Sequence, residues 1–385
     1  MATAAVNSLL RSLHSIIGGV VVSPDGAASP YPTLVAMRGD HPVPGPNSFA
    51  AAAKIAEVSA GRLDNDVAIV LVSGGSTSMI AAPLRDMSEG DLVALFELLL
   101  GSGLDIAATN AVRKRFTQWG AGRLALALAP AATHCLAMSD VEGDDLADIG
   151  SGPCVPDANT AQDVVGILEN AELLSRLSGA QREYLMSVTR GTTPDTPKAG
   201  HPAFAHVTTR IVGNNRMAVD GASLLARDKG YATQVVDEWL RGDAATAGEE
   251  IARHMLDVRG DLSGKRCVIW GGETTVKLES SAEHVGGGGR CQELALAAAR
   301  ALHDAGSSPQ GISILAAGTD GRDGATEAAG AIVDASTWGA MVAAGSDPAH
   351  ALASHASNAA LRAAGALIDR RDTGTNVNDV VIAVC

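Results

Sequence analysis

Four consecutive glycines and an arginine stand directly before a helix-like segment of the chain. The glycines occupy positions 286–289, and the Ala- and Leu-rich stretch after Arg290 is strongly patterned as a helix. Glycine lets the backbone approach an anion, and the start of a helix presents N–H groups to it. Arginine adds a planar, bidentate donor. The pattern predicts a phosphate or carboxylate site, with a plain flexible loop as the alternative.

A second loop rich in Gly and Ser follows the apolar run VAIVLV. It contains Ser73, Gly74, Gly75 and Ser76. In open α/β sheets, ligands bind beyond the carboxyl ends of the strands, where such a loop offers backbone N–H groups and hydroxyls. We therefore expect a small-molecule site here. An ordinary Gly/Ser turn is the alternative.

Two further loops are rich in carboxylates and amides. The stretch GTDGRDGATE follows another apolar run and contains Asp320 and Asp323, whose carboxylates can hold Mg²⁺ or ribose hydroxyls. The stretch DTGTNVND precedes the last apolar run and contributes Thr375, Asn376 and Asn378. A polar cluster entering a buried strand indicates the wall of a site. The alternative for the first loop is turn chemistry, in which Asp side chains bond the nearby backbone.

Three sets of residues carry weaker signals. Asp140 lies in the acid-rich stretch SDVEGDDLADIGSGPCVPD, where we expect a cation or a hydroxyl-rich substrate. Arg113 lies in NAVRKRF, for which a solvated helix face is the alternative. The ten histidines show no metal-ligand spacing and no triad-like setting, and we interpret them as structural.

Short β-branched runs alternate with Ala-rich helical stretches, which indicates an α/β fold. The apolar runs VAIVLV and VVIAV are typical of parallel strands covered by helices on both faces, so we expect a doubly wound sheet. Helices are expected from Asn47 or Ser48 to Ala60, after a cap at Ser88, and over Gln292–His303. The expected strands are Gly19–Val22, Val67–Val72, Val207–Val212, Arg266–Trp270, Ile312–Ala316 and Val380–Val384.

A domain division is expected after the segment Thr189–Phe204, where Pro, Gly and Thr cluster without apolar periodicity. We place it between Gly191 and Thr246, which gives domains 1–230 and 231–385.

Composition excludes several classes of protein. A net charge of −14 argues against nucleic acid as a partner. Five cysteines without a C-x-x-C pair suit neither a disulfide framework nor a zinc site. The chain has no recognisable leader and no run long enough to span a membrane, so we expect a cytoplasmic protein. There is no P-loop, no clean dinucleotide fingerprint and no G-x-S-x-G elbow.

These motifs together resemble the D-glycerate 2-kinases of the MOFRL type, a family also recorded under the name hydroxypyruvate reductase. The resemblance spans nearly the whole chain. It is carried by GDHPVPGPNS, SGGSTSM, NAVRKRF, SDVEGDDLADIGSGPCVPD, GGETTV, GGGGRCQELALAAA, GTDGRDGATEAAGAIVD and TGTNVND. It implies a Rossmann-like amino-terminal domain, a smaller carboxyl-terminal MOFRL domain and an active site in the cleft between them.

The resemblance implies that ATP, with Mg²⁺, phosphorylates the 2-hydroxyl of D-glycerate or a closely related small hydroxy acid. Catalytic roles fall to Arg290 and Asp320, and no metal ligand is assigned. The substrate residues are Ser73, Gly74, Gly75, Ser76, Arg113 and Asp140. The nucleotide or phosphate residues are Gly287, Gly288, Gly289, Gly318, Thr319, Gly321, Asp323, Thr375, Asn376 and Asn378. An NAD(P)H-dependent hydroxypyruvate reductase and a non-catalytic metabolite-binding protein are the alternatives, and a homodimer is left open.

The chain departs from the family pattern at four places. SGGSTSM stands where the family reads SGGGSAL, Cys291 replaces an Asn, and RRDTGTNVND replaces TGPTGTNVND. The substrate could therefore be a hydroxy acid other than glycerate. The family also has a strand, a Gly-containing turn and a lysine before the region matching ATAAVNSLL, whereas the first lysine here is Lys54. We expect either a segment encoded upstream or a divergent member with low activity.

Overall fold

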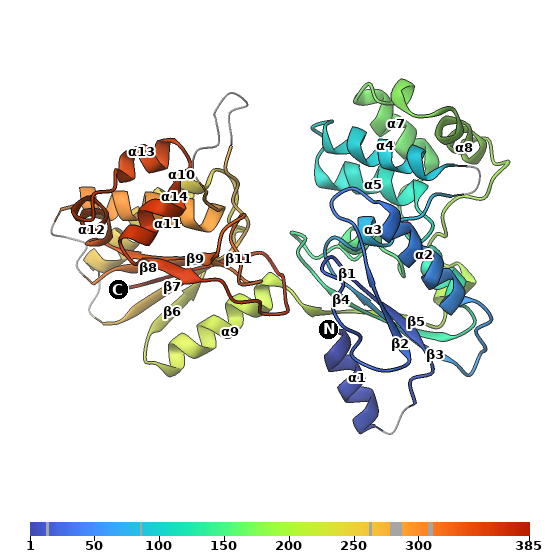
Figure 1. Cartoon of the computed structure of the whole chain (residues 1–385), viewed down its shortest axis with the longest axis horizontal. Helices are drawn as coiled ribbons and strands as arrows, with labels where there is room; N and C mark the ends of the chain where they lie inside the picture. Colours follow the sequence, from blue (N-terminus) through green and yellow to red (C-terminus); the bar gives the residue numbers. More distant parts are fainter. Residues whose placement is uncertain (13–14, 85–86, 262–263, 278–286, 307–310) are drawn as a thin grey trace. The chain divides into compact units, whose positions relative to one another are not determined.

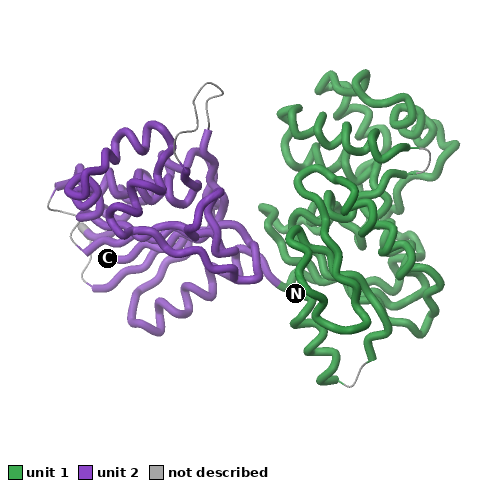
Figure 2. Tube along the Cα trace, viewed as in Figure 1, with its two compact units in different colours: residues 1–212 green, residues 213–385 purple. Residues whose placement is uncertain are grey.

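The computed structural model describes residues 1–12, 15–84, 87–261, 264–277, 287–306 and 311–385. These residues form two compact units, 1–212 and 213–385 (Figure 2). The division expected at residues 230 and 231 lies inside the second unit, and as a boundary between family domains it stays a prediction. No helix in the described ranges is long and apolar enough to cross a membrane.

Unit 1 contains two small sheets. Strand β1 (Gly19–Ser23) pairs in parallel with β2 (Leu34–Arg38). The other sheet has the order β3-β4-β5, with β3 at Val67–Val72, β4 at Ala132–Met138 and β5 at Val207–Gly213. Strands β3 and β4 are parallel, with Val72 opposite Ala137, so the loops after both strands leave the same edge of the sheet.

Helices α4, α5, α7 and α8 form a helical cluster in unit 1 (Figure 1), with a core that includes Phe96, Leu168 and Leu185. Helix α4 is capped by Ser88 as predicted. The helices of this unit are α1 (Ala2–Arg11), α2 (Pro46–Ser59), α3 (Ser76–Met79), α4 (Glu89–Leu100), α5 (Ile106–Phe116), α6 (Arg123–Leu128), η1 (Ile149–Ser151), α7 (Ala161–Asn170), η2 (Leu174–Arg176), α8 (Gly179–Thr189) and η3 (Pro202–Phe204).

Unit 2 is built on one six-stranded sheet of order β10-β9-β8-β11-β7-β6. Strands β6 and β7 pair in parallel, and the other neighbouring strands of this sheet are antiparallel. The strands are β6 (Ala232–Val235), β7 (Arg266–Gly272), β8 (Ser313–Gly318), β9 (Ala328–Asp334), β10 (Leu367–Asp369) and β11 (Asp379–Val384).

The prediction that VVIAV is a parallel strand is wrong, because β11 is antiparallel to both β7 and β8. The run is apolar for another reason. Val381 and Ala383 belong to the core that contains α11, and Val380 packs in the core that contains residues of α9. Burial on both faces therefore gives a continuous apolar run whatever the strand direction.

Helix α11 is the central helix of unit 2. It spans Arg290–Asp304, two residues earlier than predicted at its start, and Ala295, Ala297 and Ala299 are fully buried. Its small side chains admit close neighbours, since a Cβ on Gly248 of α10 would overlap the backbone of α11. The other helices are α9 (Asn215–Asp228), α10 (Ala244–Asp261), α12 (Thr337–Ala343), α13 (Pro348–Ala353) and α14 (Ser357–Ala363).

Candidate active site

The loops after β3 and β4 meet at one edge of the unit 1 sheet. Ser73, Gly74 and Gly75 follow β3 directly, and Asp140 lies two residues after β4. A Cβ on Gly74 would overlap the Asp140 carboxylate, so the two residues are in direct contact. Gly75 has a φ of +76°, which favours glycine at this position. The structure thus brings these predicted substrate residues together.

The hydroxyls of this loop are used within the protein. Ser76 Oγ donates to Ser73 O at 2.6 Å, and Thr77 Oγ1 lies 2.9 Å from Ser151 Oγ. Helix α3, which begins here, has only four residues, so its dipole is short. A ligand at this edge would therefore be met mainly by the backbone N–H groups of Gly74 and Gly75.

Arg113 lies on α5 and is a partly buried cation. Its guanidinium lies 5.0 Å above the ring of Phe96, and its buried Nε has no hydrogen-bond partner in the described part of the chain. Within the described residues it forms no ion pair. Burial lowers the pKa of Arg113, although arginine stays charged in proteins. A desolvated positive charge without a counter-charge favours an anionic ligand.

His41 connects Arg113 with the loop after β3. A Cβ on Gly75 would lie 3.0 Å from His41 Cδ2 and 3.2 Å from Nε2. Partial desolvation and the charge of Arg113 lower the pKa of His41, whereas the Asp140 carboxylate acts in the opposite direction. Sequence reasoning missed His41 because no second histidine or acid stands at a recognisable spacing from it. Its signal was the motif GDHPVPGPNS itself.

The second group of site residues lies at one edge of the unit 2 sheet. Strands β7 and β8 end there and β11 begins there, because Asp379 stands opposite both Gly272 and Gly318. Glu273, Thr319 and Asn378 are therefore neighbours. This edge is where the predicted nucleotide residues converge.

Arg290 is the first residue of α11 and is oriented by two carboxylates. Its Nε and Nη2 donate to Asp379 at 2.5 and 3.0 Å, and its Nη1 donates to Glu273. Burial raises the pKa of Asp379 to about 6, although Arg290 opposes this shift. The side chain of Arg290 is 36% exposed and that of Asp379 only 5%. Asp379 and Glu273 thus hold the guanidinium on both edges, and the Arg290 side chain as a whole stays partly exposed.

Asn378 joins this group from a left-handed backbone position, with φ +66°. Its Nδ2 donates to Glu273 at 2.8 Å, and its buried Oδ1 has no hydrogen-bond partner among the described residues. Thr319 Oγ1 donates to the carbonyl of Asn378 at 2.6 Å. The unpaired Oδ1 marks a place for a donor from a ligand or a water.

Two glycines at this edge leave space for backbone carbonyls of neighbouring loops. A Cβ on Gly318 would overlap the carbonyl of Arg322, and one on Gly321 would overlap that of Arg371. Asp320 Oδ1 accepts from the backbone N–H of Arg322 at 2.9 Å, as in the turn alternative. Thr375 and Asn376 lie in the loop just before Asn378: the backbone N–H of Thr375 donates to Thr373 Oγ1, and Asn376 Oδ1 accepts from the backbone N–H of Asn378.

The start of α11 already carries an anion, the carboxylate of Asp323. It accepts hydrogen bonds from the backbone N–H of Cys291 at 3.1 Å and of Gln292 at 2.8 Å. Desolvation raises the pKa of Asp323, and the bonds from Gln292 act in the opposite direction. A Cβ on Gly289 would overlap this carboxylate, so Gly289 makes room for the protein's own cap.

The rest of the glycine run is only partly described. Gly286 lies outside the described residues. A Cβ on Gly288 would lie 2.5 Å from Ser357 Oγ, and Gly287 O accepts from the backbone N–H of Asn358 at 3.1 Å. These contacts account for Gly288 and Gly289 without a ligand, and the ligand roles of Gly287, Gly288, Gly289 and Asp323 stay predictions.

The described residues contain no group of three or more His, Cys, Asp and Glu side chains that could hold a metal ion. Mg²⁺ in nucleotide sites needs less, because phosphates and waters supply most of its ligands. The half-buried carboxylate of Asp320 fits this requirement as a single protein ligand.

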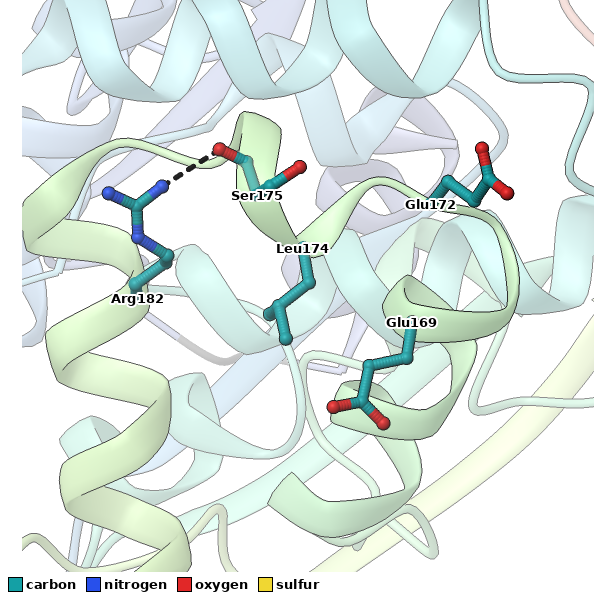
Figure 3. Close-up of a pocket in the computed structure, with 5 residues that line it drawn as sticks. All are labelled: Glu169, Glu172, Leu174, Ser175 and Arg182. Atoms are coloured by element: carbon teal, nitrogen blue, oxygen red, sulfur yellow. Dashed lines mark hydrogen bonds between the residues drawn. The ribbon is translucent and has the colours of Figure 1, made fainter.

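A hollow on the surface of unit 1 lies elsewhere. It encloses about 520 Å³ beside α7 and η2 and is lined by Glu169, Glu172, Leu174, Ser175 and Arg182 (Figure 3). Arg182 there donates to the carbonyl of Ser175 at 2.9 Å. None of the predicted site residues lines this hollow, and the two sheet edges remain the better candidates.

Comparison with known proteins matches both halves of the chain. Residues 1–186 match DUF4147, a domain of unknown function, and residues 266–379 match the MOFRL family. The chain is 36% identical to a D-glycerate 2-kinase of Thermotoga maritima, covering 100% of this chain and 87% of that protein. It is 31% identical to a glycerate 2-kinase of Pyrococcus horikoshii, covering 99% and 85%.

A protein of Agrobacterium vitis provisionally named hydroxypyruvate reductase is 35% identical over 94% of this chain and 80% of its own length. The structure superposes on the crystal structure of glycerate kinase from Thermotoga maritima with a TM-score of 0.88, covering 100% of this chain and 88% of that one at 36% identity. The resemblance inferred from the motifs is confirmed: the chain belongs to the glycerate 2-kinase family and carries its MOFRL domain.

Proposed function

We propose that this protein transfers the γ-phosphoryl group of ATP to the 2-hydroxyl of glycerate or of a closely related small hydroxy acid. The relatives named glycerate 2-kinase support the reaction class. The single observation in the structure that carries the substrate class is the guanidinium of Arg113, which forms no ion pair within the described residues and acts electrostatically on His41 next to the loop after β3.

The hydroxy acid binds at the edge of the unit 1 sheet. Arg113 pairs with the substrate carboxylate, because its buried charge has no counter-charge within the described residues. The N–H groups of Gly74 and Gly75 bond the same ligand. Asp140 accepts a hydrogen bond from a substrate hydroxyl, which selects a polyhydroxy acid over a simple fatty acid. These roles fit a substrate that carries a carboxylate at one end and hydroxyl groups on the remaining carbons.

The nucleotide phosphates bind at the edge of the unit 2 sheet. Phosphoryl transfer depends mainly on positioning and on neutralising charge. The partly exposed guanidinium of Arg290 stabilises charge on the transferring group. Asn378 Oδ1 accepts from a nucleotide hydroxyl or a bound water. When Mg²⁺ is bound, it neutralises phosphate charge, and Asp320 is its protein ligand.

Arg113→Gln tests the substrate assignment. We expect the KM for glycerate to rise about 10²-fold while the KM for ATP changes little, because an ion pair with a desolvated partner is lost. Arg190→Gln is the matched control, since Arg190 lies on the surface of the same unit in a pair with Glu183. An equal rise in both KM values would contradict the assignment.

Two assays separate the kinase from the reductase suggested by some relatives' names. ADP release in the presence of glycerate, erythronate or threonate is expected with ATP and Mg²⁺. NADH oxidation with hydroxypyruvate is not expected. Activity only in the second assay would replace the proposal with the reductase.

A further inference from the structure

The motif GDHPVPGPNS forms a closed loop attached to the start of α2. Asp40 accepts hydrogen bonds from the backbone N–H of Asn47 at 3.0 Å and from its Nδ2 at 2.8 Å. The backbone N–H of Asp40 in turn donates to Ser48 Oγ at 2.9 Å. The predicted cap residues Asn47 and Ser48 thus lie inside α2, and they bind Asp40 instead of capping the helix at their own positions.

The same loop is also attached to α3. A Cβ on Gly39 would lie 2.5 Å from the Cβ of Met79 and 2.7 Å from its carbonyl, so only glycine allows this approach. The two residues before His41 are therefore both attached to helices. Asp40 is bound to α2, and Gly39 packs against α3. These two attachments fix the backbone next to His41, whose side chain is exposed.

The imidazole of His41 faces the space beside Gly75. Its Cδ2 and Nε2 are the ring atoms nearest to that position. Across the described residues neither ring nitrogen forms a hydrogen bond, and Arg113 and Asp140 are the charged groups that act on it. Nε2 is thus available to a ligand at the point where the loop after β3 and Arg113 converge.

We propose that His41 Nε2 accepts the proton of the substrate hydroxyl that is phosphorylated. The inference rests on the proposed function and extends it to a further catalytic residue. As the hydroxyl oxygen bonds to the γ-phosphorus, the bond between that phosphorus and the bridging oxygen breaks and ADP leaves. The hydroxyl proton moves to Nε2 and later returns to solvent. Neutral His41 suits this role, because partial desolvation disfavours its protonated form.

His41→Gln is the direct test. We expect kcat to fall about 10²-fold, since general-base catalysis contributes about 10² to 10⁴ and phosphoryl transfer lies at the low end. The KM values for glycerate and ATP should change less than about threefold. His134→Gln is the matched control in the same unit, because His134 bonds Thr208 and lies on β4.

His41→Ala with added imidazole distinguishes proton transfer from support of the loop. Added imidazole is expected to raise the kcat of His41→Ala at least about tenfold and to leave the kcat of the wild type unchanged. Unchanged kcat in His41→Gln, a rise in KM alone, or no rescue by imidazole would overturn the inference. A wild type that releases no ADP with any hydroxy acid would instead contradict the proposed function.

Discussion

Asp379 binds Arg290 through both oxygens, one to Nε and the other to Nη2, from a position that is almost fully buried. This bidentate geometry fixes the plane of the guanidinium. The negative charge is buried, whereas the arginine is partly exposed. The guanidinium therefore lies partly exposed at the first residue of α11, with Glu273 bound to its Nη1.

Arg290→Ala is expected to lower kcat about 10²-fold or more, because one preorganised charge stabiliser is worth about 3 kcal/mol in the transition state. Arg290→Lys should rescue poorly, since an ammonium cannot reproduce the fork that Asp379 binds. Steady-state kinetics measure both. Arg300→Ala is the control on the same helix, where Arg300 pairs with Glu249. Full rescue by lysine would mean that charge alone matters.

Asp379 also makes folding stability depend on pH. Its pKa is raised from 3.8 to about 6, so the folded state binds its proton more tightly than the unfolded state. This contribution is fully present below pH 3.8 and is lost as the pH rises through about 6. By linkage, the free energy of unfolding of the wild type relative to Asp379→Asn should fall by about 3 kcal/mol over this range. Urea unfolding at several pH values measures it, and parallel curves would contradict the raised pKa.

The sequence located both sheet edges because a Gly-rich or acidic loop after an apolar run has a direct physical meaning. As the apolar runs predicted, β3 is followed by Ser73 to Ser76. Strand β8 ends at Gly318 and is followed by Thr319 and Asp320. The direction of β11 was not predictable from its run, since burial on both faces produces the same composition in parallel and antiparallel strands.

The contacts of individual side chains with residues distant in the sequence could not be predicted either. Asp323 and Gly289 are separated by 34 positions, and no local pattern shows that this carboxylate caps α11. His41 is similar, because its neighbours Gly75, Arg113 and Asp140 come from three different loops and helices. A residue whose partner is close in the sequence can be recognised. Ser88 was predicted as a helix cap because its partner, Asp91, lies three positions away.

Asp320→Asn is expected to raise the apparent KM for Mg²⁺-ATP about tenfold or more while the KM for glycerate changes little. The reason is that its carboxylate is the protein ligand proposed for the metal, and an amide binds Mg²⁺ more weakly. Titration of Mg²⁺ at fixed ATP measures the effect. Glu327→Gln, at an exposed site of the same loop, should leave the titration unchanged. An unaltered Mg²⁺ dependence in Asp320→Asn would refute the metal role.

Asp323→Ala separates a capping role from a nucleotide role. Removal of the carboxylate leaves the N–H groups at the start of a buried helix without acceptors, so we expect a loss of about 2 to 4 kcal/mol in stability. The KM for ATP of the folded fraction should stay near that of the wild type. Chemical unfolding and kinetics at low temperature give the two values. A stable variant with a much higher KM for ATP would support the nucleotide role instead.

Asp157 is expected to stabilise the helix that carries Arg113. Its carboxylate lies 3.0 Å from Lys114 Nζ and 3.4 Å from Arg115 Nη2, and all three side chains are buried. Desolvation opposes ionisation, yet the charges of Lys114 and Arg115 lower the pKa of Asp157 overall. A lowered pKa gives stability that is present above the ordinary value of 3.8 and is lost as the pH falls through the folded value.

Asp157→Asn should therefore reduce the free energy of unfolding by about 3 to 5 kcal/mol at neutral pH, because buried Lys114 loses its counter-charge and buried Arg115 is left with Asp195. The difference between wild type and variant should shrink in acid, as Asp157 itself becomes protonated. Urea unfolding at pH 7 and below pH 4 measures both values. Asp220→Asn is the control, since its pair with Arg216 is exposed and worth little. A difference that is the same at both pH values would show that packing, and not charge, holds α5 in place.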